Sequence, residues 1–326
     1  EKREKGTSRG ATSGNRGGFG SEPVPFFEGL QDLSFGVKMP THGAAEVLEN
    51  EALSESIYRI RVEQREIAAS VVPGQFVMIR PHGGTDPLLG RPLALYDVGL
   101  DAAGEPASID LVYLVQGNGT RALSRLGRGD QVDIWGPLGN SFPRRRGEAD
   151  FRHVMLLAGG IGQTPFVAVA KELVGKQEYG KSPVDRNAME KVTFIWGARS
   201  AQALAGLDDF RKLGIEVHVA TEDGSAGTRG RVTDVAKSLI EKGAAPTAIF
   251  SCGPEPMLEA VSKLGETYQV PTWVSLETKM ACGYGVCFSC VCPVKDDKIA
   301  VGWDYSRVCI EGPVFRSTSI AWEQLA

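Results

Sequence analysis

The segment Met280-Ala-Cys-Gly-Tyr-Gly-Val-Cys-Phe-Ser-Cys-Val-Cys292 contains four closely spaced cysteines, and it is followed further along the chain by Cys309. Cys282, Cys287 and Cys290 have the spacing C-x4-C-x2-C, and Cys309 is one distant fourth cysteine. This is a spacing that holds a [2Fe–2S] cluster. We therefore predict that these four thiolates bind such a cluster in a C-terminal module.

The loop between the cysteines is suited to the tight turn that such a cluster requires. Three thiolates from one loop must converge on a compact anionic core, so the loop has to turn sharply and direct its N–H groups toward sulfur. Gly283 and Gly285 lack the Cβ atoms that would obstruct this turn.

Two other uses of clustered cysteines fit the pattern less well. A structural zinc site needs a second C-x2-C pair or nearby histidines, and no histidine follows His218. Disulfides are the second alternative, but nothing resembles a signal peptide, and thiols crowded into one short loop suit a metal cage better than bridges. Cys292 is left over, and we interpret it as a bystander.

Length and charge set the broad class of the protein. The chain has 326 residues, more than one domain usually has, so two or three domains are expected. The net charge of −4 argues against a nucleic-acid partner, because neutralising phosphates requires a basic face. The most apolar segment, residues 154–170, is interrupted by glycines and a proline and does not fit a membrane span. We expect a cytoplasmic protein without a nucleic-acid or membrane partner.

The first half of the chain changes character near residue 44. Residues 1–43 contain Gly, Ser, Arg and Lys with few apolar side chains. Because such a segment buries too little apolar surface to offset the entropy lost on ordering, we expect it to be a disordered extension. Within residues 44–148 a period of two appears, for example at Tyr58, Ile60 and Val62, between Gly and Pro turns. This pattern predicts a small antiparallel β-barrel.

Two segments of the predicted barrel are suited to phosphate. Arg91 is held by Pro92, and its planar guanidinium matches a diphosphate, although an Arg-Pro pair is usually just a surface turn. A predicted strand also runs into Gly117-x-Gly119-Thr120 and a helix, where phosphate can approach backbone amides and the Thr120 hydroxyl. A plain strand-to-helix turn explains the second segment as well, so the residues alone leave both readings open.

Residues 149–274 have the pattern of a Rossmann-like α/β domain. A continuous apolar strand at residues 153–158 runs into Gly159-Gly-Ile-Gly-Gln-Thr-Pro165, whose proline begins a helix. Strands alternating with helices predict a parallel sheet with helices on both faces, and the glycine loop is the expected nucleotide site, although it is not the full G-x-G-x-x-G motif. Further buried strands are expected at residues 192–196, 215–220 and 248–251, the last of them in the sheet.

Cys252 follows that last strand, at the carboxyl edge of the sheet where ligands bind. A lone cysteine at such a place is more often a small buried apolar residue than a functional thiol. Residues 275–326 then form the cluster module.

Taken together, these residues resemble the electron-transfer subunits of class 1B dihydroorotate dehydrogenase, within the ferredoxin–NADP reductase-like superfamily. The likeness covers about residues 44–316, and its specific part is the cysteine block with the Gly-Pro-Val-Phe315 sequence that follows it. The other motifs are shared across the superfamily. The motifs are Arg91-Pro92, Gly117-x-Gly119-Thr120, Gly136-Pro-Leu-Gly-Asn140, Gly159-Gly160-x-Gly162, Ala220-Thr-Glu-Asp-Gly-Ser-x-Gly-Thr-x-Gly230, Cys252-Gly-Pro254, Met280-Ala-Cys-Gly-x-Gly-x-Cys287 with Cys290, and Arg307-Val-Cys-x-x-Gly-Pro-Val-Phe315.

The resemblance implies three cofactors: FAD, NAD and a [2Fe–2S] cluster on the four cysteines. One position departs from the family, because Ala94 stands where Ser or Thr is usual. This change removes a hydroxyl bond to the flavin, and we expect it to affect the flavin's potential more than its presence. The residues implied to contact FAD are Arg91, Pro92, Leu93, Ala94, Val112, Tyr113, Leu114, Gly119 and Thr120. The residues implied to contact NAD are Gly159, Gly160, Gly162, Thr164 and Pro165, with Cys252, Gly253 and Pro254 beside the nicotinamide.

The resemblance also implies an activity in pyrimidine (UMP) biosynthesis. Electrons from the FMN of a dihydroorotate-oxidising catalytic subunit would pass through the cluster to FAD and on to NAD+, and the two subunits would form a heterotetramer. No side chain is expected to act as a general acid or base, because the cofactors supply the chemistry. NAD is expected over NADP, although Arg199 follows the second strand of the sheet and is suited to a 2′-phosphate.

Two other functions remain open. One is an NAD(P)H flavin reductase that feeds a hydrogenase, an oxygenase or a ferredoxin. The other is a non-enzymatic redox sensor, against which the two phosphate-binding loops argue.

Overall fold

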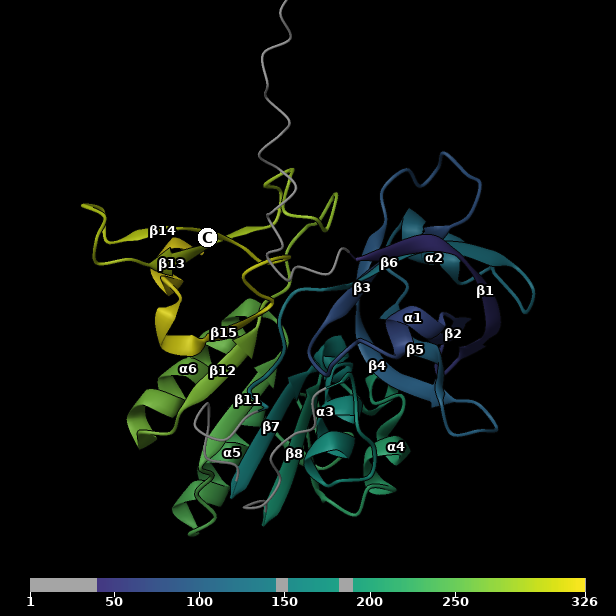
Figure 1. Ribbon diagram of the computed structural model, residues 1–326. Coiled ribbons are helices and arrows are strands. Elements are labelled where there is room, and N and C mark those ends of the chain that lie inside the picture. Colours follow the sequence, from purple (N-terminus) through teal and green to yellow (C-terminus); the bar gives the residue numbers. More distant parts are fainter. Residues whose placement is uncertain (1–39, 145–151, 182–189, 326) are drawn as a thin grey trace, which may run out of the picture. The chain divides into compact units, whose positions relative to one another are not determined.

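The computed structural model describes residues 40–144, 152–181 and 190–325 (Figure 1). Most of the extension expected at residues 1–43 therefore lies outside the described residues. The expected end of the extension at residue 43 is corrected, because strand β1 (Thr41–Ala52) begins before it. Thr41 pairs with Gly136, and the ring of His42 packs edge-on against Trp135 at 5.5 Å between centroids. Backbone pairing and this ring contact extend the strand beyond the point where the alternating pattern begins.

Six antiparallel strands form the predicted barrel, which closes in the order β1-β2-β5-β4-β3-β6. Alternate side chains such as Ile60 and Val62 fill its interior and are fully buried. The short helices α1 (Arg65–Ala68) and α2 (Asn118–Leu123) belong to this part of the chain. The remaining strands are β2 (Ile57–Glu63), β3 (Phe76–Pro81), β4 (Arg91–Leu100), β5 (Pro106–Leu114) and β6 (Gln131–Leu138).

The rest of the chain forms a seven-stranded sheet in the order β10-β9-β8-β7-β11-β12-β15. All neighbours are parallel except β12 and β15, which are antiparallel. The order reverses at β7, and such a switch point is where open sheets of this kind bind ligands. The strands are β7 (His153–Gly159), β8 (Lys191–Ala198), β9 (Glu216–Thr221), β10 (Thr228–Arg229), β11 (Ala248–Cys252), β12 (Thr272–Ser275) and β15 (Val314–Arg316).

The four long strands of this sheet are confirmed, but the expectation that the strand at 248–251 is the last one is wrong. After that strand the chain adds β12, and it later returns from the cysteine segment to pair β15 with β12. Both strands have too few residues to show a period in the sequence.

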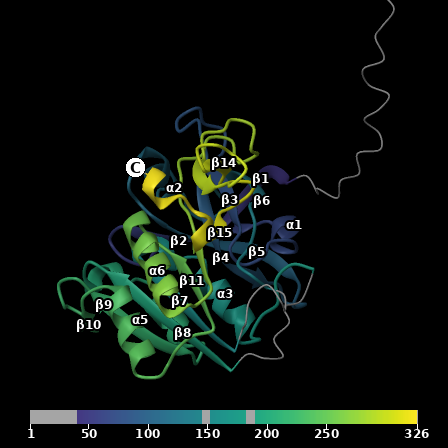
Figure 2. The same cartoon turned by 90° about the vertical axis from the view of Figure 1, so that its left-hand side faces the viewer.

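Helices cover both faces of the sheet (Figures 1 and 2). Along β7, Val154, Leu156 and Ala158 belong to one apolar core, and Met155 and Leu157 belong to the core on the other face. Helices α3 and α4 contribute to the first core, and α5 and α6 contribute to the second. The helices are α3 (Phe166–Leu173), α4 (Leu207–Arg211), α5 (Val232–Glu241) and α6 (Glu255–Tyr268).

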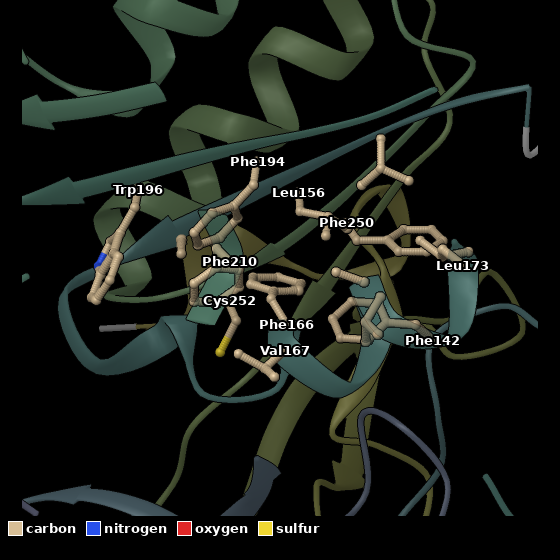
Figure 3. Close-up of a cluster of buried hydrophobic side chains, with 14 of the residues drawn as sticks. Phe142, Leu156, Phe166, Val167, Leu173, Phe194, Trp196, Phe210, Phe250 and Cys252 are labelled. Carbon is tan, nitrogen blue, oxygen red and sulfur yellow. The ribbon is translucent and has the colours of Figure 1, made fainter. Parts of the chain in front are cut away.

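The first of these cores is rich in aromatic rings and joins the sheet to the barrel (Figure 3). Phe194 and Phe210 stack with centroids 3.9 Å apart, and Phe142 stacks on Phe250 at 5.0 Å. Phe142 follows the last barrel strand, and Val112 of β5 packs in the same cluster. One continuous core therefore fixes the barrel against the sheet.

The cysteine segment leads into a two-stranded hairpin of β13 (Val291–Lys295) and β14 (Trp303–Arg307) before the chain returns to the sheet as β15. In the described part of the chain, no helix has the length and apolar character needed to cross a membrane.

Candidate functional site

A cavity of about 260 Å³ lies where the barrel, the sheet and the segment before the cysteines meet. Ala94 of β4 lines it from the barrel, Thr164 and Cys252 line it from the sheet, and Met280 lines it from the segment that leads to Cys282. The cavity therefore brings residues expected at the flavin together with Thr164 and Cys252 of the expected nicotinamide site, and the segment that leads to Cys282 forms part of its wall.

Most of the residues expected to contact the flavin line this cavity. Arg91 and Gly119 are exceptions, but they lie against each other, since a Cβ on Gly119 would be 2.6 Å from the Arg91 Nε. Gly119 thus lets the guanidinium pack onto the start of α2, as the diphosphate reading requires. The lining residues from this set are Pro92, Leu93, Ala94, Val112, Tyr113, Leu114 and Thr120.

The Thr120 hydroxyl has a structural task in addition to the predicted one. It accepts hydrogen bonds from the backbone N–H groups of Gln116 (3.0 Å) and Gly117 (3.3 Å) and so fixes the turn that begins α2. The strand-to-helix turn and the phosphate site are therefore compatible readings of the same residues, because the remaining amides of the turn stay available.

Sequence reasoning missed four polar residues of this cavity: Gln116, Ser275, Glu277 and Thr278. Surrounding protein raises the pKa of the Glu277 carboxyl, although its side chain still opens onto the cavity. Within the described ranges, the buried Thr278 Oγ1 has no hydrogen-bond partner. A buried orphan oxygen in a cavity wall calls for a polar ligand atom, which fits a flavin ring. Ser275 is the last residue of β12, Glu277 and Thr278 follow that strand, and no motif in the sequence marks these three residues.

Cys252 is both a core residue and a wall of the cavity. Its side chain packs in the aromatic core, and burial raises the pKa of its thiol well above the usual range. It therefore faces the cavity as a neutral thiol, which combines the two readings that the sequence left open.

A second cavity, of about 400 Å³, lies at the carboxyl ends of the parallel strands. Gly159, Gly160 and Pro254 line it near the switch point, and Arg199 and Glu222 line it at the ends of β8 and β9. Gly160 has φ +55°, and nothing lies within 4 Å of the place where its Cβ would be. A ligand phosphate can therefore approach the Gly160 backbone closely.

Gly162, Pro165 and Gly253 line neither cavity. A Cβ on Gly162 would collide with the Cys252 carbonyl oxygen, so this glycine allows the ends of β7 and β11 to pack closely. Pro165 lies immediately before α3. These residues shape the nucleotide loop without lining either cavity.

The four predicted cluster cysteines form two thiol pairs. The Cys282 side chain contributes to the lowered pKa of Cys287, and the Cys290 side chain contributes to the raised pKa of Cys309, so the cysteines lie near each other in these two pairs. In the ranges that the structure describes, no three acidic, imidazole or thiol groups converge on a single-ion site. A [2Fe–2S] cluster takes four thiolates, two on each iron, so the paired arrangement fits it. Cys292 lies on β13, where it is fully buried in the same apolar cluster as Cys290 and Cys309.

Hydrogen-bond donors surround the paired sulfurs. The Tyr284 N–H donates to the Cys282 Sγ at 3.3 Å, and the Ser289 hydroxyl lies 3.1 Å from the Cys287 Sγ. This hydroxyl contact is the largest cause that lowers the pKa of Cys287, to about 6. Burial instead raises the pKa of Cys309 to about 12. Bound metal would replace both protons.

Both glycines of the loop have positive φ, as the tight turn requires. Gly283 has φ +75°, and its Cβ would lie 2.8 Å from Leu138 Cδ1 and Met78 Cγ, while Gly285 has φ +74°. Trp135 of β6 donates from its Nε1 to the Cys282 carbonyl at 2.9 Å. The barrel wall therefore holds the cysteine loop in close contact.

The chain combines a closed barrel, a parallel sheet with a cavity at its switch point, and a loop of paired thiols that follows the wall of the cavity between barrel and sheet. These features define a class of protein: a reductase of the ferredoxin reductase type with an added iron–sulfur module. A solved structure of an NADH-dependent reduced ferredoxin-NADP oxidoreductase, described in connection with flavin-based electron bifurcation, is similar, with a TM-score of 0.70 and 26% identity over 86% of this chain and 91% of that one.

Family comparisons narrow this class. Residues 277–321 match the iron–sulfur cluster binding domain of dihydroorotate dehydrogenase B, and residues 156–263 match the oxidoreductase NAD-binding domain. The electron transfer subunit of dihydroorotate dehydrogenase B (NAD(+)) from Listeria monocytogenes serotype 4a is 36% identical over 84% of this chain and 97% of its own length. The subunit of that name from Geobacillus kaustophilus is 36% identical over 84% and 96%.

The chain belongs to the family of electron transfer subunits of NAD-dependent dihydroorotate dehydrogenase B. This membership confirms the resemblance, the oxidoreductase function and the cofactor set of FAD, a [2Fe–2S] cluster and NAD. An electron transfer subunit implies a catalytic partner subunit.

Proposed function

We propose that the three parts of the chain each hold one cofactor, with the boundaries expected from the sequence apart from the earlier start of β1. The barrel (44–148) would hold FAD, the sheet (149–274) would hold NAD, and residues 275–326 would hold the cluster on Cys282, Cys287, Cys290 and Cys309. The observation that carries this proposal is the shared cavity, because its walls come from all three parts.

Each part of the chain then has a defined task. When bound, the cluster carries single electrons, the flavin pairs them, and NAD+ accepts them as a hydride. Arg91 and the start of α2, which pack together, would hold a flavin diphosphate, and Ala94 and Thr278, which line the cavity, would border the ring. Met280 lines that cavity and Cys282 is two residues further on, so the chain itself brings the cluster loop close to the flavin.

We propose that the partner is an FMN-containing dihydroorotate dehydrogenase catalytic subunit and that the two form a heterotetramer. The surface around the exposed Cys287 supports this docking site. Val286, Phe288 and Ile310, which we call the cluster face, are 80%, 60% and 43% exposed. The guanidinium of Arg307 lies over the Phe288 ring, 5.2 Å from its centroid. Exposed apolar side chains gathered beside a redox centre are typical of an interface that brings a second centre into range.

A reductase that feeds ferredoxin is the second candidate, because the similar solved structure is described as an NADH-dependent reduced ferredoxin-NADP oxidoreductase. The curated relatives have higher identity, at 36%, and nearly their full length is covered, so they favour the first candidate. A cytoplasmic location stays a prediction.

The test is reconstitution with an FMN-containing catalytic subunit. We expect dihydroorotate-dependent reduction of NAD+ only when both subunits are present. Phe288→Asp should lower this activity at least tenfold at fixed subunit concentrations and leave NADH oxidation with artificial acceptors unchanged, since a charge in an apolar interface is costly. Leu100→Asp is the matched control, because Leu100 is 53% exposed at the end of β4.

Iron content is measured for each variant, so that cluster loss is not mistaken for lost docking. No dihydroorotate-dependent activity in a mixture whose cofactors are complete would overturn the proposed partner. Full activity of Phe288→Asp would overturn the assignment of the cluster face.

A further inference from the structure

Two oppositely charged side chains, Arg199 and Glu222, line the 400 Å³ cavity at the ends of neighbouring strands. Their backbones are tied together, because the Glu222 N–H donates to the Ala198 carbonyl at 3.1 Å and the Asp223 N–H donates to the Arg199 carbonyl at 3.2 Å. The carboxylate and the guanidinium therefore project from adjacent points of one cavity wall.

Strand order places this pair at the adenosine end of a bound dinucleotide. Thr164 and Cys252 line the flavin cavity, so the nicotinamide belongs on that side, and Gly160 offers an open backbone for the pyrophosphate. The sheet runs β9-β8-β7-β11, so the half of the dinucleotide beyond β7 must cross the ends of β8 and β9. That is where Arg199 and Glu222 lie.

Local hydrogen bonds fix the loop that carries Glu222. The Thr221 hydroxyl donates to the Ala226 carbonyl at 2.7 Å, and the Ser225 hydroxyl donates to Asp223 at 2.6 Å. The same Ser225 oxygen accepts from the Ala201 N–H at 2.8 Å, which ties the loop to the residues after Arg199. The backbone position from which the Glu222 carboxylate projects is thus set before any ligand binds.

Neither charged group takes part in an ion pair that stabilises the described fold. In the described part of the chain, no ion pair involves Arg199 or Glu222, and a third charged residue, Arg231, lines the same cavity. Without Glu222 the cavity would present two arginines, which suit the 2′-phosphate of NADP. With Glu222 it presents an acceptor for the two hydroxyls of an NAD ribose.

We propose that Glu222 is the residue that makes this site prefer NAD over NADP: its carboxylate accepts a hydrogen bond from the adenosine ribose and repels a 2′-phosphate that Arg199 would otherwise bind. This inference rests on the proposed NAD site. The Glu222 carboxylate also explains why a chain of an NAD-dependent family has Arg199, a residue that alone would favour NADP.

The test compares the purified full chain, loaded with its cofactors, with the variant Glu222→Gln. Oxidation of NADH and of NADPH is followed with an artificial acceptor, and the ratio of kcat/KM for NADPH to that for NADH is the readout. We expect this ratio to rise about tenfold in Glu222→Gln, because a like charge near the phosphate is removed. Inhibition by 2′,5′-ADP should strengthen about tenfold, while inhibition by 5′-AMP should not.

Four further variants make the result specific. Arg199→Ala in the Glu222→Gln background should return the ratio toward its original value, and Glu222→Asp should keep the NAD preference. Glu266→Gln, an exposed carboxylate on α6, is the charge-matched control and should change nothing. Arg199→Ala alone should lower NADPH use further, a test that does not depend on the Glu222 variants folding.

An unchanged ratio and unchanged 2′,5′-ADP inhibition in Glu222→Gln would overturn the inference while leaving the NAD site intact. If the unmodified protein oxidises neither nucleotide, the proposed function itself fails instead.

Discussion

Gly283→Ala tests whether the cysteine loop is built around its tight turn. An alanine at φ +75° costs roughly 1–2 kcal/mol in backbone strain. Its Cβ would also lie 2.8 Å from Leu138 Cδ1 and Met78 Cγ, and overpacking of this kind costs roughly 1–3 kcal/mol. The sum is about 2–5 kcal/mol, concentrated where the loop meets the barrel.

Gly302→Ala is the matched control. Gly302 has φ +80°, but nothing lies within 4 Å of the place where its Cβ would be, so this variant carries the strain without the collision. The difference between the two variants is therefore the packing term of about 1–3 kcal/mol, which corresponds to a factor of roughly 5 to 150.

The assay is the rate at which iron is released to a chelator under anaerobic conditions. Gly283→Ala should lose iron about 5 to 150 times faster than Gly302→Ala. Both variants should keep NADH oxidation with artificial acceptors, since the flavin cavity is unchanged. Equal rates of iron release would refute the idea that contact between the loop and the barrel holds the cluster in place.

Three more predictions follow from the site and the sheet. Cys309→Ser should abolish the cluster and Cys292→Ser should not; normal iron and sulfide in Cys309→Ser would refute the ligand assignment. Ala94→Ser should slow FAD dissociation about fivefold, measured by flavin fluorescence, because one neutral hydrogen bond contributes about 1 kcal/mol; an unchanged rate would mean that the hydroxyl supplies nothing. Glu216→Gln should lower the free energy of unfolding by about 1 kcal/mol near neutral pH, measured by denaturant titration, after discounting for exposure. The hydrogen bond from Lys191 lowers the pKa of Glu216 from 4.5 to about 2, so this difference should shrink as pH falls through that range, and a difference independent of pH would contradict the assignment.

The sequence was sufficient where a residue type has one dominant physical use. The loop glycines and the long apolar strands each predicted a feature that the structure contains, because positive φ and burial leave few alternatives. The cysteine spacing predicted an iron–sulfur module, which the match to an iron–sulfur cluster binding domain confirms. Alternating side chains likewise predicted the barrel, whose interior they fill.

The sequence was insufficient where tertiary contacts decide. Strands β12 and β15 are too short for a period, and they form because neighbouring strands offer unpaired edges. Glu277 and Thr278 belong to no motif, and only the folded chain brings them to the flavin cavity. Gly162 fits the pattern of a phosphate-binding glycine, yet it packs against the Cys252 carbonyl.

The most direct test of the central claim is stopped-flow reduction of the flavin in the isolated chain. The claim is that this chain conducts electrons between NAD and a partner subunit that oxidises dihydroorotate. NADH should therefore bleach the flavin of the isolated chain, while dihydroorotate should leave it oxidised until an FMN-containing catalytic subunit is added. Bleaching of the isolated chain by dihydroorotate would contradict the account.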